Sequence, residues 1–263
     1  MIQPPAYKSV GVGPRTVVFL HGIGGNRHSF DDQLPYFASG WRAVAWDMPG
    51  YGDSRHTGPL SFALLADALA ALVDKLKAPR VAVVGHSLGG MIAQEFAARY
   101  PNRLSALVLF ATSAAFGGKD DTFKNQFLAA RLAPLDRGLT PADFAADVVG
   151  PMFGDATSAE IKARAVASMA AIKPDAYRAA VNCIVTFDRR AELKNIKCPT
   201  LVLAAERDPL APPKSMQRMA ADIPGARFET LPGVGHLANF EAPSLFNATV
   251  RTFLDTAIAK RSA

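Results

Sequence analysis

The 263-residue sequence predicts an α/β protein with a mostly parallel central sheet, helices on both faces of that sheet and an inserted helical cap. Three observations predict this fold. Apolar runs alternate with helical patterns before residue 113 and again after residue 190. Residues 113–190, by contrast, show helical patterns alone. One apolar run leads through a Gly-x-Ser-x-Gly turn directly into a helix. We therefore expect a core built from residues 1–112 and 191–263, and a cap built from residues 113–190.

The first part of the core alternates predicted strands with predicted helices. Apolar runs that end in Gly- or Pro-containing turns predict strands at 16–20, 42–46, 81–84 and 106–110. Apolar residues at helical spacing predict a helix at 61–76, and a second helix at 91–100 follows the Gly-x-Ser-x-Gly turn. Strands that alternate with helices are typical of a parallel sheet, because the chain must cross back after each strand.

Helix-start signals predict the cap. Thr140, followed by Pro141 and Asp143, has the residue types that begin a helix. Further helices are predicted at 121–132, at 158–172 and from 174 onward. An all-helical block between two strands of a parallel sheet predicts a lid over the carboxyl edge of the sheet. The core pattern then resumes, with strands at 200–205 and 227–231 and helices at 213–223 and 243–259.

Composition narrows the class of protein. The 29 basic and 23 acidic residues give a net charge of +6, but no basic cluster stands out, so we expect no nucleic-acid partner. Cys183 and Cys198 form neither a disulfide framework nor a metal-ligand pattern, so we expect reduced thiols, no metal and no cofactor. Without a signal peptide or a membrane-spanning run, a soluble cytoplasmic protein is expected, with no membrane partner and with homo-oligomerisation left open.

Residues 81–100 carry the strongest functional signal. Gly85, Ser87 and Gly89 form a Gly-x-Ser-x-Gly turn between a buried strand and a helix. In that context the turn is a nucleophile elbow, which holds its central residue in a sparsely allowed backbone conformation. The strain lifts the Ser87 hydroxyl above the edge of the sheet, at the positive end of the following helix. Ser87 is therefore the candidate nucleophile.

A serine nucleophile needs a base, and the base needs an orienting acid. His236 is the best candidate base, because it follows the strand at 227–231 in a loop that can reach the carboxyl edge of the sheet. Asp208, which follows the strand at 200–205, is the candidate acid, with Glu206 as the alternative. His86 is expected to point elsewhere and His21 to be structural. His28 and His56 lie in loops early in the chain and are possible pocket residues.

Acyl transfer also needs two backbone N–H groups aimed at the developing oxyanion. The amide of Leu88, directly after the nucleophile, supplies the first. The second is expected in the Gly-rich turn His21-Gly22-Ile23-Gly24-Gly25, where the main chain can approach the substrate closely. We assign it to the backbone of Ile23.

With these motifs placed, the whole chain resembles the α/β-hydrolase fold superfamily with a helical cap. Within that superfamily it is most similar to the 3-oxoadipate enol-lactonases and related small esterases. The matching segments are Phe187-Asp188-Arg189-Arg190, the run from Cys198 to Leu203, Pro212-Pro213, and the run from Gly235 to Pro243. The chain departs from the lactonase pattern in two respects. Residues 113–190 contain no tryptophan, and the elbow Gly-His-Ser-Leu-Gly-Gly at 85–90 is the generic version of the motif.

The resemblance implies a hydrolase that cleaves a small carboxylic ester or lactone, as in aromatic-compound catabolism, through an acyl-enzyme and without a cofactor. An enol-lactone substrate carries a carboxylate and needs a cationic anchor, for which Arg27, Arg55, Arg131 and Arg178 are unranked candidates. Other expected substrate-binding residues are Gly22, Phe127 and Leu237.

Three other functions stay open. They are hydrolysis of carbon–carbon bonds in ring meta-cleavage products, a perhydrolase side activity, and ligand binding with little turnover. Haloalkane dehalogenation is disfavoured, because it requires an aspartate where Ser87 stands.

Overall fold

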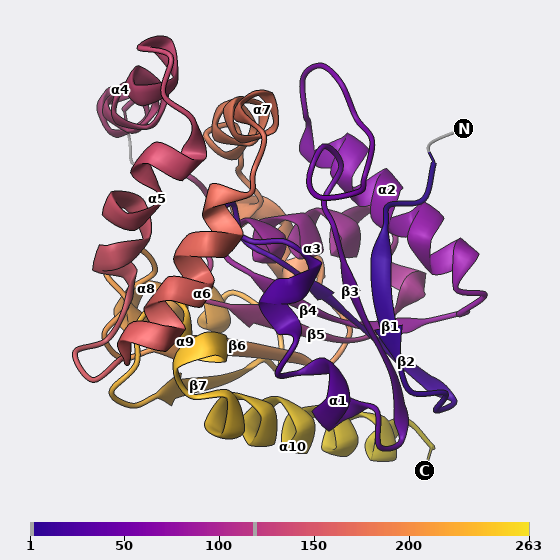
Figure 1. The fold of residues 1–263 in the computed structure, drawn as a ribbon. Coiled ribbons are helices and arrows are strands. Elements are labelled where there is room, and N and C mark those ends of the chain that lie inside the picture. The colour runs from indigo at the N-terminus through magenta and orange to yellow at the C-terminus, as the bar shows by residue number, and fades with distance from the viewer. Residues whose placement is uncertain (1–2, 118–119, 263) are drawn as a thin grey trace.

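A computed structural model describes residues 3–117 and 120–262, and within them seven strands form one sheet (Figure 1). The order across the sheet is β1-β3-β2-β4-β5-β6-β7. All neighbours pair in parallel except β1, which runs antiparallel to β3 at the edge. The strands are β1 Tyr7–Val10, β2 Arg15–Leu20, β3 Trp41–Trp46, β4 Val81–His86, β5 Leu104–Phe110, β6 Thr200–Ala205 and β7 Arg227–Leu231.

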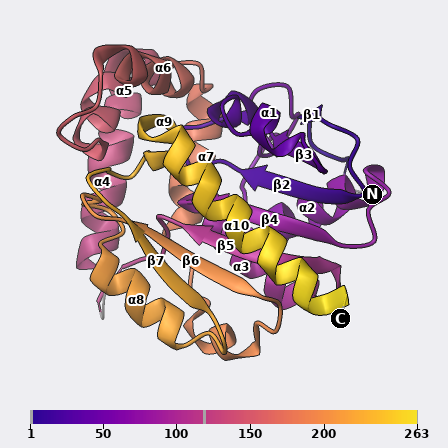
Figure 2. The ribbon, with the colours of Figure 1, turned by 90° about the horizontal axis from the view of Figure 1, so that it is seen from below.

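Central strands are apolar on both sides because helices cover both faces of the sheet. In β4, Val81 and Val83 pack into one apolar cluster, while Ala82 and Val84 pack into the other. One face is covered by α2 (Phe62–Lys75), α3 (Leu88–Arg99) and α8 (Pro213–Ala221). The opposite face is covered by α1 (Leu34–Phe37) and α10 (Pro243–Ser262), and Figure 2 shows α10 lying across the sheet.

The cap helices lie between β5 and β6 in the chain and beyond the carboxyl ends of the strands (Figures 1 and 2). They are α4 (Thr122–Asp136), α5 (Pro141–Val149), α6 (Ala159–Ala170) and α7 (Pro174–Ile184). The two chain segments that join cap to core run side by side: Phe116 N–H donates to Phe187 O (2.8 Å), and Arg189 N–H donates to Ala114 O (2.8 Å).

Short helical turns complete the structure: η1 (Arg27–Phe30), η2 (Pro101–Arg103), η3 (Gly150–Met152), η4 (Arg190–Asn195) and α9 (Ala238–Glu241). Among the described residues, no helix combines the length and apolar character that crossing a bilayer requires. Met1 and Ile2, on which part of the expectation about the start of the chain rests, lie outside the described residues.

The predicted fold class is confirmed, with two corrections to its elements. The helix after the Gly-x-Ser-x-Gly turn begins at Leu88 rather than at residue 91, because the turn passes into the helix without a linker. The edge strand β1 was not predicted. Its four residues are mostly half-buried, so they lack the continuous apolar run that marks the central strands.

Candidate active site

Ser87 stands between β4 and α3 in a strained conformation. Its φ of 53° and ψ of −118° lie outside the regions that residues with a side chain usually adopt. Hydrogen bonds on both sides hold it there: Ser87 N–H donates to Phe110 O (3.0 Å), and Ser87 O accepts from Gly90 N–H (2.9 Å) and from Thr112 Oγ1 (2.7 Å). The positive end of α3, which begins at Leu88, lies directly behind the hydroxyl.

Asp208 and His236 meet at the carboxyl edge of the sheet. Both side chains are buried, and His236 Nδ1 lies 2.8 Å from Asp208 Oδ2. The other oxygen of Asp208 accepts from the amides of Leu210 (2.8 Å) and Ala211 (3.0 Å). Burial opposes ionisation of Asp208, but the hydrogen bond from His236 and these amides outweigh it and lower the pKa of Asp208. Asp208 is thus an anion fixed behind the imidazole.

Glu206, the alternative acid, has a different partner. Its Oε2 accepts from the amide of Gly233 at 2.7 Å, in the exposed part of the loop that carries His236. The backbone partners of the two residues also differ: Glu206 N–H donates to Leu231 O, whereas Asp208 N–H donates to Ala205 O. Of the two carboxylates, Asp208 is therefore the one bound to His236.

His86, which was expected to point elsewhere than Ser87, lies against His236. His86 Nε2 donates to His236 O (2.9 Å), and the two ring centroids are 4.9 Å apart. Burial, reinforced by the neighbouring His236, lowers the pKa of His86 to about 3. A neutral imidazole can donate from one nitrogen only, and His86 uses that donor to hold the backbone of His236. The position of His86 directly before Ser87 in the sequence was the signal that could have pointed to this contact with the site.

The Gly-rich turn after β2 packs directly on the elbow. A Cβ placed on Gly22 would lie 3.1 Å from Ser87 Cβ, so glycine allows this close approach. Among the described residues, the amides of Ile23 and Leu88 donate to no protein acceptor. His21 fixes the turn, because its ring contacts Gly22 O (2.8 Å) and accepts from Met48 N–H (3.0 Å). Two unpaired amides beside Ser87 match the arrangement that an oxyanion requires.

Ser87 and His236 line the same cavity of about 370 Å³ between core and cap. Most of the other lining side chains are apolar, and half of the other lining residues come from the cap. The expected residues Gly22, Ile23, Phe127, Arg131 and Leu237 all belong to the lining. Among the described lining residues, Arg131 is the only one with a permanently charged side chain.

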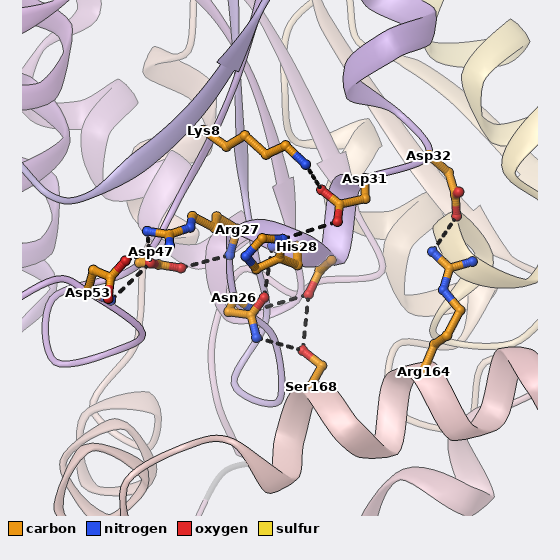
Figure 3. Close-up of polar contacts among 11 residues, drawn as sticks. Lys8, Asn26, Arg27, His28, Asp31, Asp32, Asp47, Asp53, Arg164 and Ser168 are labelled. Carbon is orange, nitrogen blue, oxygen red and sulfur yellow. Dashed lines mark hydrogen bonds and ion pairs between the residues drawn. The ribbon is translucent and has the colours of Figure 1, made fainter.

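Arg27 and Arg55 do not line this cavity, contrary to expectation. The Arg27 guanidinium binds Asp47 Oδ2 (3.0 Å) and Asp53 Oδ2 (2.5 Å), and Figure 3 shows the side chain pointing toward both. Arg55 is exposed. Arg178, the fourth cationic candidate, pairs with Asp136 (2.7 Å) and is absent from the lining. The partners of Arg27 stand at least 20 positions away, so the sequence did not reveal them.

His28 and His56 also lie outside the lining. Near His28, polar contacts join α6 of the cap to the core (Figure 3). Asn26 Nδ2 donates to Ser168 Oγ (3.2 Å), and Arg164 pairs with Asp32 (2.8 Å). No described cluster of three or more His, Cys, Asp or Glu side chains is placed to hold a metal ion.

Comparisons with known proteins bear on the fold and the family of the chain. The model of the alpha/beta hydrolase fold family matches residues 15–243. A pimeloyl-[acyl-carrier protein] methyl ester esterase from Neisseria meningitidis is 28% identical, over 94% of this chain and 96% of that protein. A 3-oxoadipate enol-lactonase from Acinetobacter baylyi is 27% identical, over 94% and 92%. The structure of a thermophilic esterase from Thermogutta terrifontis superposes with a TM-score of 0.88 at 26% identity, covering 96% of this chain and 93% of that one.

Proposed function

Because the chain belongs to the α/β-hydrolase fold family, we propose that it is a serine hydrolase acting on a small carboxylic ester or lactone. The observation that carries the proposal is the 2.8 Å contact between Asp208 and His236, with His236 and Ser87 lining one cavity. The named activities of the relatives support ester or lactone hydrolysis, since one is a methyl ester esterase and another an enol-lactonase. A cavity of about 370 Å³ suits a small substrate.

The proposed reaction proceeds through an acyl-enzyme. Because Asp208 engages Nδ1 of His236, Nε2 is the nitrogen left to accept the Ser87 proton. Ser87 Oγ bonds to the carbonyl carbon, and the resulting oxyanion accepts from the amides of Leu88 and Ile23. When the intermediate collapses, the C–O bond to the leaving group breaks and that oxygen takes the proton from His236. Water then attacks the acyl carbon while His236 removes its proton. The bond from that carbon to Ser87 Oγ breaks, Oγ takes the proton from His236, and the carboxylic acid leaves.

Covalent labelling tests the proposal directly. Incubation with a fluorophosphonate is expected to add the mass of one phosphonyl group to the intact protein and none to Ser87→Ala. An unchanged mass for the wild type would instead favour a ligand-binding protein. Assays with an ester panel, an enol-lactone and a vinylogous diketone extend the test. Turnover of the diketone alone would reject the ester or lactone substrate in favour of carbon–carbon hydrolysis.

We further propose that the preferred substrate carries a carboxylate that binds Arg131. Among the described residues, Arg131 forms no ion pair with an acidic side chain, and its guanidinium carbon lies 5.5 Å from the Phe127 ring centroid. Tyr177, another lining residue, stays protonated because burial raises its pKa, although Arg131 opposes that rise. A cation without a carboxylate partner inside an apolar cavity is a site for an anionic group.

Arg131→Met is expected to lower kcat/KM about 10- to 100-fold for an ester with a terminal carboxylate, because a charge-assisted hydrogen bond is lost. The matched neutral ester should change by about twofold or less. Arg178→Met is the control, since it removes the same charge from the cap at a position outside the cavity lining. Equal losses for the charged and neutral esters, or an equal effect of Arg178→Met, would assign the anchor elsewhere.

A further inference from the structure

One carboxylate connects the cap to the loop that carries His236. Glu241, at the end of α9, accepts from the Gly235 amide through Oε1 (3.0 Å). Its Oε2 accepts from the Gly154 amide (2.8 Å) and from Thr157 Oγ1 (2.6 Å). Gly235 directly precedes His236, whereas Gly154 and Thr157 lie between α5 and α6 of the cap. The two oxygens of Glu241 thus bind two different parts of the molecule.

The two segments that Glu241 joins also touch through their backbones. His236 N–H donates to Met152 O at 2.7 Å. A Cβ on Gly235 would lie 2.3 Å from Met152 O, and a Cβ on Gly154 would lie 2.6 Å from Gly233 O. No side chain fits between these backbones, so any movement of this cap segment acts directly on the peptide of His236.

The core holds the same loop by separate contacts. His86 donates to His236 O, and Glu206 accepts from the Gly233 amide. These contacts differ in burial. Gly233 is exposed, so water can replace Glu206, whereas Gly235 and Gly154 are buried and their amides would lose their acceptor. Of the carboxylates bound to the loop backbone, Glu241 is the one that also binds the cap.

We propose that Glu241 is a positioning residue, which places His236 for proton transfer only while the segment 152–157 of the cap is seated. This inference rests on the proposed function, because it takes His236 as the base. The described contacts make the cap part of the catalytic geometry as well as a cover for the cavity. Displacement of the cap segment would free the His236 amide from Met152 O, and it would free Oε2 of Glu241 from the Gly154 amide and the Thr157 hydroxyl. A base displaced by about 1 Å is expected to lose up to about 100-fold in rate.

Steady-state kinetics of Glu241 variants test the proposal. Glu241→Ala is expected to lower kcat about 10- to 100-fold, with KM changed by less than about threefold, because the base and not the binding surface is disturbed. Glu241→Gln keeps one of the two acceptor sides and should recover part of the rate. Thr157→Val removes the hydroxyl contact at constant shape, and its effect should disappear in the Glu241→Ala background. Glu206→Ala is the matched control and should cost less than about threefold.

Hydrogen exchange supplies a readout that does not depend on activity. In folded Glu241→Ala, peptides covering 150–158 and 232–241 are both expected to exchange faster than in the wild type. Unchanged kcat in Glu241→Ala, additive effects of Thr157→Val and Glu241→Ala, or an equal loss in Glu206→Ala would each overturn the proposal. Ser87→Ala is measured in parallel. If it keeps activity, the proposed function fails, whereas its inactivity beside a fully active Glu241→Ala rejects the role of Glu241 alone.

Discussion

Replacing Ser87 with alanine is expected to reduce kcat against the best ester or lactone by about 10⁴-fold or more. The hydroxyl is the only group removed, and the acyl-enzyme cannot form without it. Binding should survive, because the cavity lining is otherwise unchanged, so a competitive product or substrate analogue should bind Ser87→Ala and wild type with similar affinity. The kinetics of an ester assay and isothermal titration of the analogue measure the two quantities.

The variant His236→Ala tests whether Ser87 and His236 act together in the reaction. If Ser87 and His236 act as one unit, His236→Ala alone is expected to be nearly as inactive as Ser87→Ala, and the double variant no worse than either. Independent contributions would multiply, making the double variant far slower than each single one. Multiplied losses, or more than about 1% of the wild-type kcat in either single variant, would contradict the shared mechanism. Circular dichroism of each variant checks that the fold is intact.

The sequence was sufficient for the central sheet because each central strand is buried on both faces. That burial requires an uninterrupted apolar run, and the fully buried β6 was predicted at the bounds that the structure shows. The edge strand β7 was also predicted at its observed bounds, although its residues before Leu231 are half-buried or exposed. The half-buried edge strand β1 has no such run and was missed. The capping-box pattern at Thr140 and Asp143 likewise marked the start of α5, because the helix end is stabilised locally.

In the candidate site, too, the sequence indicated the features that local patterns encode and missed those that depend on long-range contacts. Ser87 directly follows β4, and His236 lies in the loop that follows β7, so their chain positions indicated the sheet edge at which they meet. The choice between Asp208 and Glu206 depended on which carboxylate contacts His236, and no local pattern encodes that. Contacts across long separations were equally hidden: Glu241 meets Gly154 from 87 positions away. Arg27 looked like a substrate anchor until the structure placed Asp47 and Asp53 against it.

Gly89→Ala is expected to destabilise the protein by about 3 kcal/mol or more, because the first turn of α3 packs directly on the end of β2. A Cβ on Gly89 would lie 2.2 Å from Leu20 O and 2.8 Å from His21 O. These atoms belong to backbone, so neither can rotate away as a side chain could. Urea-induced unfolding measures the loss as a shift in the transition midpoint.

Gly150→Ala is the matched control for this glycine. No atom lies within 4 Å of a Cβ built there, and its φ of −49° suits alanine, so its stability should be unchanged or higher by up to about 1 kcal/mol. Gly89→Ala should also lower the kcat of the molecules that remain folded, since moving α3 displaces Ser87 and the Leu88 amide from the turn that carries Ile23. Equal unfolding midpoints for the two variants would mean that α3 can move without cost. The elbow would then be held by something other than this close contact of backbones.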